Sequence, residues 1–189
     1  MVMDMDSGKI WVQGAKRYLS PNCDKRPPQT RVDLLVIHNI SLPPEQFEGD
    51  YVEDFFRNRL DPSAHPYFKE IAHLCVSSHL YIKRDGSLIQ FVPLYVRAWH
   101  AGDSCWKDRS RCNDYSIGIE MEGSDCQAFE AAQYETLASV TKQIMSEYPA
   151  ITADRIVGHS DIAPDRKTDP GEFFDWELYF ASLDEADAA

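Results

Sequence analysis

The chain has 189 residues, of which 31 are acidic and 19 basic, so its formal net charge is −12. This length predicts one domain over 1–189, with a core between about residues 30 and 180. The 43% hydrophobic content is typical of a globular chain. Nucleic acids and anionic membranes bind basic surfaces, so the acidic charge argues against both as partners.

The cysteine pattern bears on the compartment. An odd number of cysteines without a C-x-x-C pair indicates neither a disulfide framework nor a structural zinc knuckle. The first nine residues lack the apolar core of a secretory signal, and no apolar stretch has the length of a bilayer span. We therefore expect a cytoplasmic protein, and we expect it to be a monomer. The cysteines are Cys23, Cys75, Cys105, Cys112 and Cys126.

The first predicted elements are an irregular lead-in, a strand and a helix. Residues 1–30 are polar and contain three prolines, a pattern typical of irregular structure. Residues 32–38 are a short run rich in branched apolar side chains, which indicates a buried strand. Pro43 and Pro44 follow, and proline cannot continue a central ladder. Aromatic and aliphatic residues at helical spacing then predict a helix over about residues 50–60.

The clearest local pattern is the Asp85-Gly86 pair between two apolar runs in residues 78–93. Glycine accepts the positive φ of a tight turn, so this segment predicts a β-hairpin. Residues 116–122 alternate between apolar and other side chains and predict a further strand.

The C-terminal part predicts a long amphipathic helix over about 130–148, a short strand over 155–159 and a loop over 162–171. A last helix near 175–182 and a frayed tail over 182–189 complete the chain. Strands and helices alternate without regular β-α-β repeats. We therefore predict a mixed α/β fold with one central mixed β-sheet flanked by helices.

Two of the six histidines stand where predicted strands meet loops. His38 precedes a proline-containing loop, and His159 precedes the irregular segment near the C-terminus. Sites on open sheets gather at such strand ends, and imidazole is a suitable ligand for zinc. A third ligand remains open among Asp161, Asp165 and Asp169.

The segment around Asp169 offers a cation as well as a carboxylate. In an extended chain, Lys167 and Asp169 project to the same side because side chains alternate. One side chain would bring a metal ligand and the other a positive charge into the same cleft. The sequence has no H-E-x-x-H motif, which excludes the helix-borne arrangement of zinc proteases.

Glu120 and Glu122 are candidates for activating a water molecule. Both lie on one face of the predicted strand 116–122, and a buried glutamate is costly unless it has a partner or a role. The periodicity alone favours the opposite interpretation. Ile117, Ile119 and Met121 alternate cleanly as a core face, which would leave both glutamates in solvent.

A series of motifs adds a family resemblance. In chain order they are VIHNIS (36–41), DP with AHPYF (61–68), RDG (84–86), RAWHAG (97–102), RCND (111–114), IGIEMEG (117–123) and GH with IAPDRKTDPG (158–171). Between about residues 10 and 180 the chain closely resembles the AmpD family of 1,6-anhydro-N-acetylmuramyl-L-alanine amidases. These cytosolic enzymes of cell-wall recycling belong to a wider group of zinc amidases with phage T7 lysozyme and the peptidoglycan recognition proteins.

The resemblance implies the fold of that group and a zinc-dependent reaction. The expected substrate is an anhydromuropeptide, cleaved between the lactyl group of 1,6-anhydro-N-acetylmuramic acid and L-alanine. His38, His159 and Asp169 are implied as ligands of Zn²⁺. Glu120 is implied as the catalytic carboxylate, and Lys167 as the cation beside the scissile carbonyl. For Glu120 this overrides the periodicity, since a strand buried on both faces can place an acid toward a cleft.

The resemblance also implies residues that bind the muropeptide, namely Asn39, Trp99 and Arg111. One departure is Cys75, at a position where we expect arginine in close relatives. If that arginine holds a peptide carboxylate, the preference of this chain for peptide length could differ.

Two other functions remain open from the residues alone. Some recognition proteins of the wider group bind peptidoglycan fragments without hydrolysis, and they are expected to have lost a metal ligand. All three implied ligands are present here, which favours catalysis. A zinc peptidase acting on the stem peptide is the second alternative, and only the family resemblance favours the sugar–peptide amide over it.

Overall fold

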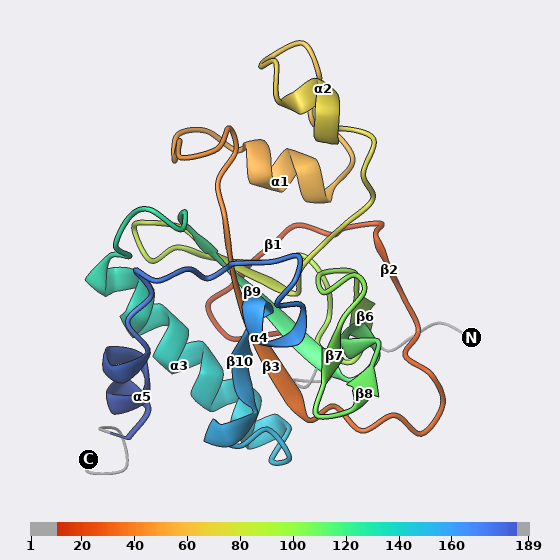
Figure 1. The fold of residues 1–189 in the computed structure, drawn as a ribbon, viewed down its shortest axis with the longest axis vertical. Coiled ribbons are helices and arrows are strands. Elements are labelled where there is room, and N and C mark those ends of the chain that lie inside the picture. Colours follow the sequence, from red (N-terminus) through yellow and green to blue (C-terminus); the bar gives the residue numbers. More distant parts are fainter. Residues whose placement is uncertain (1–10, 185–189) are drawn as a thin grey trace.

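The computed structural model describes residues 11–184 and places a six-stranded β-sheet at the centre of the molecule (Figure 1). Within this sheet one neighbouring pair is antiparallel, and all other neighbours run parallel. The predicted mixed sheet is thereby confirmed. In spatial order the strands are β1 (Lys16–Arg17), β5 (Leu88–Gln90), β4 (Leu80–Ile82), β9 (Ser116–Glu122), β3 (Leu34–Ile40) and β10 (Ile156–Gly158).

Helices pack against the sheet in two groups (Figure 1). α3 (Ala131–Glu147) and α5 (Trp176–Asp184) lie together and form the largest apolar cluster with β3 and β9. α1 (Tyr51–Phe56) and α2 (Phe68–Ile71) lie apart from them and pack against β4 and β5 in a second cluster. The predicted long helix over about 130–148, the last helix near 175–182 and the flanking arrangement are confirmed.

The side chains of β3 alternate between two apolar clusters. Leu35 and Ile37 face α3, whereas Leu34 and Val36 pack with residues of the 101–115 segment. Both faces of the central strands are therefore covered, and all seven residues of β9 are buried. A polar side chain on these strands therefore cannot reach bulk solvent through either face of the sheet. It is satisfied within the protein or opens into a cleft at a strand end.

The hairpin predicted from Asp85-Gly86 is present as the β4–β5 pair, with Ile82 opposite Leu88. Gly86 has a φ of +82°, and a Cβ atom there would lie 2.9 Å from the backbone oxygen of Ala132. Glycine is needed both for the turn and for its close approach to α3.

Short elements account for most differences from the prediction. Part of the predicted irregular lead-in forms β1 and β2 (Cys23–Asp24), and β2 pairs with β6 (Arg97–Ala98). β7 (Cys105–Trp106) and β8 (Arg109–Ser110) pair with each other. Two-residue strands carry no measurable periodicity, so their partners rather than their own residues determine them.

Several element boundaries also differ from the prediction. The helix expected over 50–60 ends at Phe56, and α2 was not predicted. The strand expected over 155–159 ends at Gly158, and α4 (His159–Ile162) follows it at once. Residues 182–184 belong to α5 and not to a frayed tail. Residues 1–10 and 185–189, where the remaining lead-in and tail were expected, lie outside the described residues.

Two further observations concern the described part of the chain. Between residues 11 and 184, no helix is long and apolar enough to cross a membrane. All five cysteines are unpaired.

Candidate active site

Three adjacent parallel strands bring the candidate ligands and the candidate base together. In the β3–β9 register, His38 lies directly opposite Glu120. In the β10–β3 register, Gly158 lies opposite Ile37, so His159 follows at the level of His38. The carboxyl ends of parallel strands meet at one edge of a sheet, which is where ligands bind in such folds. The site is thus a consequence of strand register.

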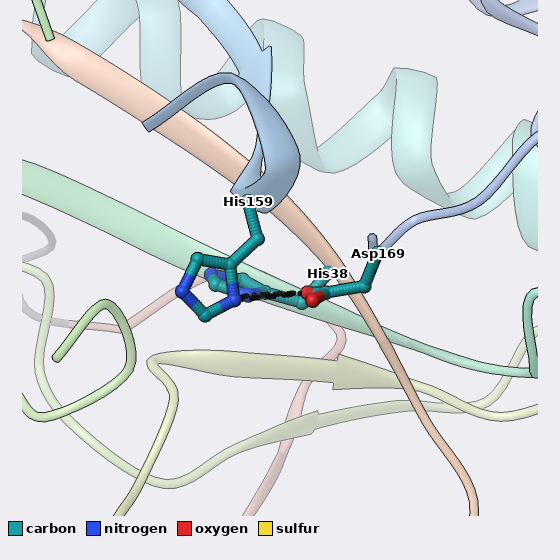
Figure 2. A group of neighbouring side chains, drawn as sticks. All are labelled: His38, His159 and Asp169. Atoms are coloured by element: carbon teal, nitrogen blue, oxygen red, sulfur yellow. Dashed lines mark hydrogen bonds and ion pairs between the residues drawn. The ribbon is translucent and has the colours of Figure 1, made fainter. Parts of the chain in front are cut away.

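His38, His159 and Asp169 converge on one point (Figure 2). The two Nδ1 atoms lie 2.9 Å apart, and each lies 3.0 Å from Oδ2 of Asp169. Asp169 comes from the loop after α4, and its carbonyl accepts a hydrogen bond of 3.0 Å from the amide of Ser160. This bond holds the Asp169 loop beside the helix that carries His159. Of the three open candidates for a third ligand, Asp169 is the one that joins the histidines.

The protonation states of this cluster fit a metal ion. Burial lowers the pKa of His38 to about 4, partly opposed by Asp169, so its imidazole is neutral at pH 7. Burial alone would raise the pKa of Asp169, but its interactions with His159 and His38 hold it below its usual range. Neutral imidazole and ionised carboxylate are the forms that bind metals.

The geometry of the donor set fits zinc. Two imidazole nitrogens and one carboxylate oxygen leave one position of a tetrahedron open, as catalytic zinc sites do. Bonds of roughly 2.0–2.1 Å in a tetrahedron separate the ligand atoms by about 3.3 Å. The observed separations of 2.9 and 3.0 Å are close to this value, and a small outward shift of each side chain would reach it.

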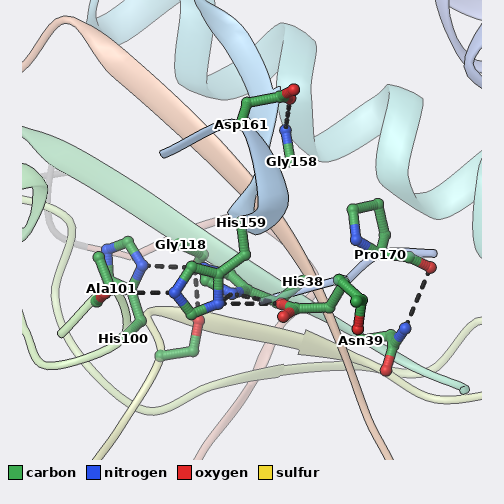
Figure 3. A network of polar contacts seen from close by, with 12 residues as sticks. His38, Asn39, His100, Ala101, Gly118, Gly158, His159, Asp161 and Pro170 are labelled. Atoms are coloured by element: carbon green, nitrogen blue, oxygen red, sulfur yellow. Dashed lines mark hydrogen bonds and ion pairs between the residues drawn. The ribbon is translucent and has the colours of Figure 1, made fainter. Parts of the chain in front are cut away.

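The outer nitrogen of each histidine also has a partner (Figure 3). Nε2 of His159 donates to the backbone oxygen of Ala101 at 3.2 Å. Nε2 of His38 lies 2.9 Å from Nδ1 of His100. Such outer partners orient ligating imidazoles. The sequence reasoning did not assign His100 a role. Its position in the RAWHAG motif was the available signal.

Glu120 is only 8% exposed, and within residues 11–184 its Oε2 has no hydrogen-bond partner. Burial and the nearby charge of Asp169 raise its pKa well above the usual range, while Lys167 opposes the rise. An orphaned buried carboxylate beside a metal-type cluster is typical of a functional site. The expectation from periodicity that Glu120 and Glu122 face solvent is wrong, because both faces of β9 are covered.

Glu122 differs from Glu120 although it lies two residues away on the same face. Its Oε1 accepts a hydrogen bond of 2.9 Å from the hydroxyl of Tyr81, and Oε2 accepts one of 2.8 Å from the amide of Arg84. Glu122 is therefore satisfied within the fold, and Glu120 is the carboxylate left open to the cleft.

Lys167 lines the same cleft as His38 and Glu120 and acts electrostatically on both. Among residues 11–184, its ammonium group makes no hydrogen bond or ion pair. A cation without a fixed partner beside the cluster can interact with a ligand that enters the cleft.

The cleft has a volume of about 630 Å³ and extends from the cluster to an apolar wall. Leu74 and Val76 contribute to this wall, while Cys75 between them is exposed and does not line the cleft. The other wall residues include Leu42, Phe55, Phe56, Tyr67 and Ile71.

The three expected substrate-binding residues are not all brought together. Asn39 and Trp99 line the cleft. The amide of Asn39 donates to Asp125 at 2.7 Å and to the backbone oxygen of Pro170 at 3.0 Å, which ties it to the loop of Asp169 (Figure 3). Arg111 does not line the cleft. Its side chain is 71% exposed and pairs with Asp114 at 3.3 Å.

Comparison with known proteins gives the family of the chain. The family described as N-acetylmuramoyl-L-alanine amidase matches residues 28–172, which include all three cluster residues. The chain belongs to this family of hydrolases.

Individual relatives indicate which kind of amidase the chain is similar to. The chain is 52% identical to the 1,6-anhydro-N-acetylmuramyl-L-alanine amidase AmpD of Haemophilus influenzae over 182 residues, covering 96% of this chain and 98% of the relative. A crystal structure of a selenomethionine AmpD derivative matches with a TM-score of 0.91 and 51% identity, covering 95% of this chain and 99% of that one. A structure of the amidase AmiD of Escherichia coli in complex with anhydro-N-acetylmuramic acid-L-Ala-D-γ-Glu-L-Lys also matches. Its TM-score is 0.61 at 30% identity, and the match covers 84% of this chain and 60% of that one. The expected amidase fold is confirmed.

Proposed function

We propose that the chain hydrolyses the amide between the lactyl group of 1,6-anhydro-N-acetylmuramic acid and L-alanine, with zinc held by His38, His159 and Asp169. The observation that carries the proposal is Glu120, a buried carboxylate that lies beside a His-His-Asp cluster and whose Oε2 finds no hydrogen-bond partner in the described part of the chain. Similarity to AmpD over nearly the whole chain supports the anhydro sugar as part of the substrate. The ligand named in the AmiD structure supports a muropeptide of this class.

Each residue of the site has a definite task in this reaction. When bound to the cluster, zinc supplies a Lewis acid that polarises a carbonyl and acidifies a water molecule. Glu120 accepts a proton from the attacking water, whose oxygen bonds to the lactyl carbonyl carbon. As the carbon–nitrogen bond breaks, Glu120 returns that proton to the amine of L-alanine. Its raised pKa makes this carboxylate a stronger base than an ordinary glutamate, which suits a group that accepts a proton and then returns it.

Lys167 stabilises the negative charge that develops on the carbonyl oxygen. A donor in this position contributes about 2.7–4 kcal/mol to the transition state in well-studied hydrolases. The products are the anhydro sugar with a free lactyl carboxylate and a peptide that begins with L-alanine. No glycosidic bond is broken.

Further observations support the finer parts of the proposal. Asn39 and Trp99 as substrate ligands are supported by their position in the cleft, and Arg111 by the family resemblance alone. A role in peptidoglycan recycling is supported by the similarity to AmpD. Five unpaired cysteines agree with a reducing compartment such as the cytoplasm. A single domain acting as a monomer completes the proposal.

The decisive experiment is incubation of the zinc-loaded protein with 1,6-anhydro-N-acetylmuramyl-L-Ala-D-γ-Glu-L-Lys, followed by mass spectrometry of the products. We expect the free anhydro sugar and the intact tripeptide, and no products after treatment with a chelator. Shortened peptides still attached to the sugar would identify a peptidase instead. Unchanged substrate, bound but not cut, would identify a binding protein.

A further inference from the structure

The outer nitrogens of the two histidines of the cluster have partners of different kinds. For His159 the partner is the carbonyl of Ala101, which can only accept a hydrogen bond. The proton of His159 therefore lies on Nε2, and Nδ1 presents its lone pair to the cluster. For His38 the partner is the ring of His100, which either donates or accepts. Nothing in this contact alone decides which nitrogen of His38 carries the proton.

The contact continues through His100 to a further polar group. Nε2 of His100 lies 3.0 Å from Oγ of Ser116, the first residue of β9. His38, His100 and Ser116 thus form a chain of two hydrogen bonds that leads away from the cluster. In one direction, Nε2 of His38 donates to Nδ1 of His100, and Nε2 of His100 donates to Oγ of Ser116. Nδ1 of His38 is then free to bind a metal. In the other direction, the proton of His38 lies on Nδ1, where it blocks the site.

The fold holds His100 in this position from two sides. Its ring lies over Gly118, and a Cβ atom at that position would lie 2.6 Å from the imidazole. Its backbone amide donates to Oδ1 of Asn113 at 3.0 Å, and the amide of Ala101 donates to the same oxygen at 2.8 Å. One side chain therefore fixes the short segment that supplies the partners of both histidines.

We propose that His100 is a positioning residue that keeps the proton of His38 on Nε2, with Ser116 as the terminal acceptor. The inference rests on the proposed zinc site. Zinc at Nδ1 of His38 requires Nε2 to donate, so Nδ1 of His100 accepts, and Nε2 of His100 donates to Ser116. Metal binding then selects one direction of the chain. A partner that cannot accept weakens the site without removing a ligand.

The test compares two substitutions of His100 that differ in whether the new side chain can accept a hydrogen bond from Nε2 of His38. His100→Phe keeps a ring of similar size and removes the acceptor. His100→Asn places an amide oxygen near the position of Nδ1. Zinc affinity is measured by competition with a chromophoric chelator. We expect a loss of about 10–100-fold for the phenylalanine variant, in the range seen for outer partners of metal ligands, and recovery of most of it for asparagine.

A spectroscopic measurement reports the proton itself. In the zinc-loaded protein, nitrogen-edited NMR should show a protected proton on Nε2 of His38, and the phenylalanine variant should lose its protection. His73→Phe, an exposed histidine, is the matched control and should leave affinity and spectrum unchanged. Ser116→Ala removes only the end of the chain and should lower zinc affinity by a smaller factor. It carries the test if the ring variants fail to fold, as judged by circular dichroism of the metal-free proteins.

The outcomes separate this inference from the proposed function. If the unaltered protein binds no zinc, the proposed zinc site is wrong. If it binds zinc and both His100→Phe and Ser116→Ala retain its affinity and its histidine spectrum, the positioning role is wrong while the zinc site stands.

Discussion

The two ends of the cleft are built in different ways. At the metal end, His38, Glu120 and His159 stand on or directly after three adjacent parallel strands, and backbone register aligns them. At the proposed substrate end, Trp99 lines the cleft and follows a two-residue strand, while Arg111, which does not line the cleft, precedes a short helical turn. The indole of Trp99 donates to Asp24 at 3.2 Å, and Arg111 pairs with Asp114. Side-chain contacts, and not register, therefore place the substrate end.

This difference has a consequence for substitutions. Groups fixed by register remain close together when one of them is replaced, so a substitution at the metal end removes a function and leaves the others in place. Groups fixed by side-chain contacts move when a partner is lost. We therefore expect large, separable effects at the metal end and small effects on substrate affinity at the other.

The largest effect is expected for Asp169→Ala. It removes the only carboxylate of the cluster and leaves two imidazoles to hold a divalent cation. Because the metal supplies several kcal/mol of transition-state stabilisation, activity should fall at least about a thousandfold. Metal analysis should show loss of zinc in parallel. Asp165→Ala, an exposed carboxylate in the same loop, is the control and should keep both. Full zinc content in Asp169→Ala would show that another group completes the site.

Glu120→Gln should separate metal binding from turnover. The glutamine cannot accept the proton of the attacking water, and general base catalysis contributes about 10²–10⁴-fold. We expect kcat to fall by that factor while zinc content stays at the level of the unaltered protein. Glu122→Gln is the matched variant, since its carboxylate is satisfied by Tyr81 and Arg84. It should lose stability, by about 1–3 kcal/mol, and retain most of its kcat when folded. Equal losses of kcat in both would refute the distinction.

We also expect Glu120→Gln to stabilise the metal-free protein, by an amount that depends on pH. Folding raises the pKa of Glu120 above its ordinary value of 4.5, so the folded state binds the proton more tightly than the unfolded state. As pH rises above 4.5, the folded protein loses stability through this group, and a glutamine does not. Urea unfolding should show Glu120→Gln more stable by about 1–3 kcal/mol at pH 7, with no difference at pH 4 or below. A less stable variant at pH 7 would show that Glu120 has a partner in the folded protein.

The next largest loss of activity is expected for Lys167→Met. Methionine keeps the length of the side chain and removes the charge, so the stabilisation of the carbonyl oxygen is lost. We expect kcat to fall about 10²–10³-fold, the range for one such donor, with KM nearly unchanged. Lys69→Met, an exposed lysine on α2, is the control. A rise in KM without a change in kcat would instead place Lys167 among the groups that bind the ground state.

The sequence predicts those parts of the metal end that stand at the ends of predictable strands. The apolar run before His38 and the short strand before His159 indicated two strand ends, and strand ends in a sheet meet. Asp169 could not be chosen from Asp161 and Asp165 by spacing, because the path of a loop depends on contacts such as the one between Asp169 and Ser160. Only the family resemblance singled it out.

Glu120 illustrates the main limit of periodicity. Alternation distinguishes the two faces of a strand but does not say whether the second face meets solvent, a helix or a cleft. Here the segment 101–115 and α1 cover that face. His100 was missed for a related reason. Its role depends on a contact across 62 residues of sequence, and no local pattern records such a contact.

The smallest effect is expected at Arg111, and it tests the substrate end directly. The family resemblance implies a contact with the muropeptide, while the side chain is 71% exposed, pairs with Asp114 and does not line the cleft. An exposed ion pair contributes about 0–1 kcal/mol, so Arg111→Ala should leave stability and zinc content unchanged. If the 103–114 segment stays where it is when substrate binds, KM should rise less than about fivefold, equivalent to 1 kcal/mol. Steady-state kinetics with the anhydromuropeptide measures this. A rise of tenfold or more, absent in the control Arg109→Ala, would show that the segment moves toward the cleft and that the substrate end is completed only by the substrate.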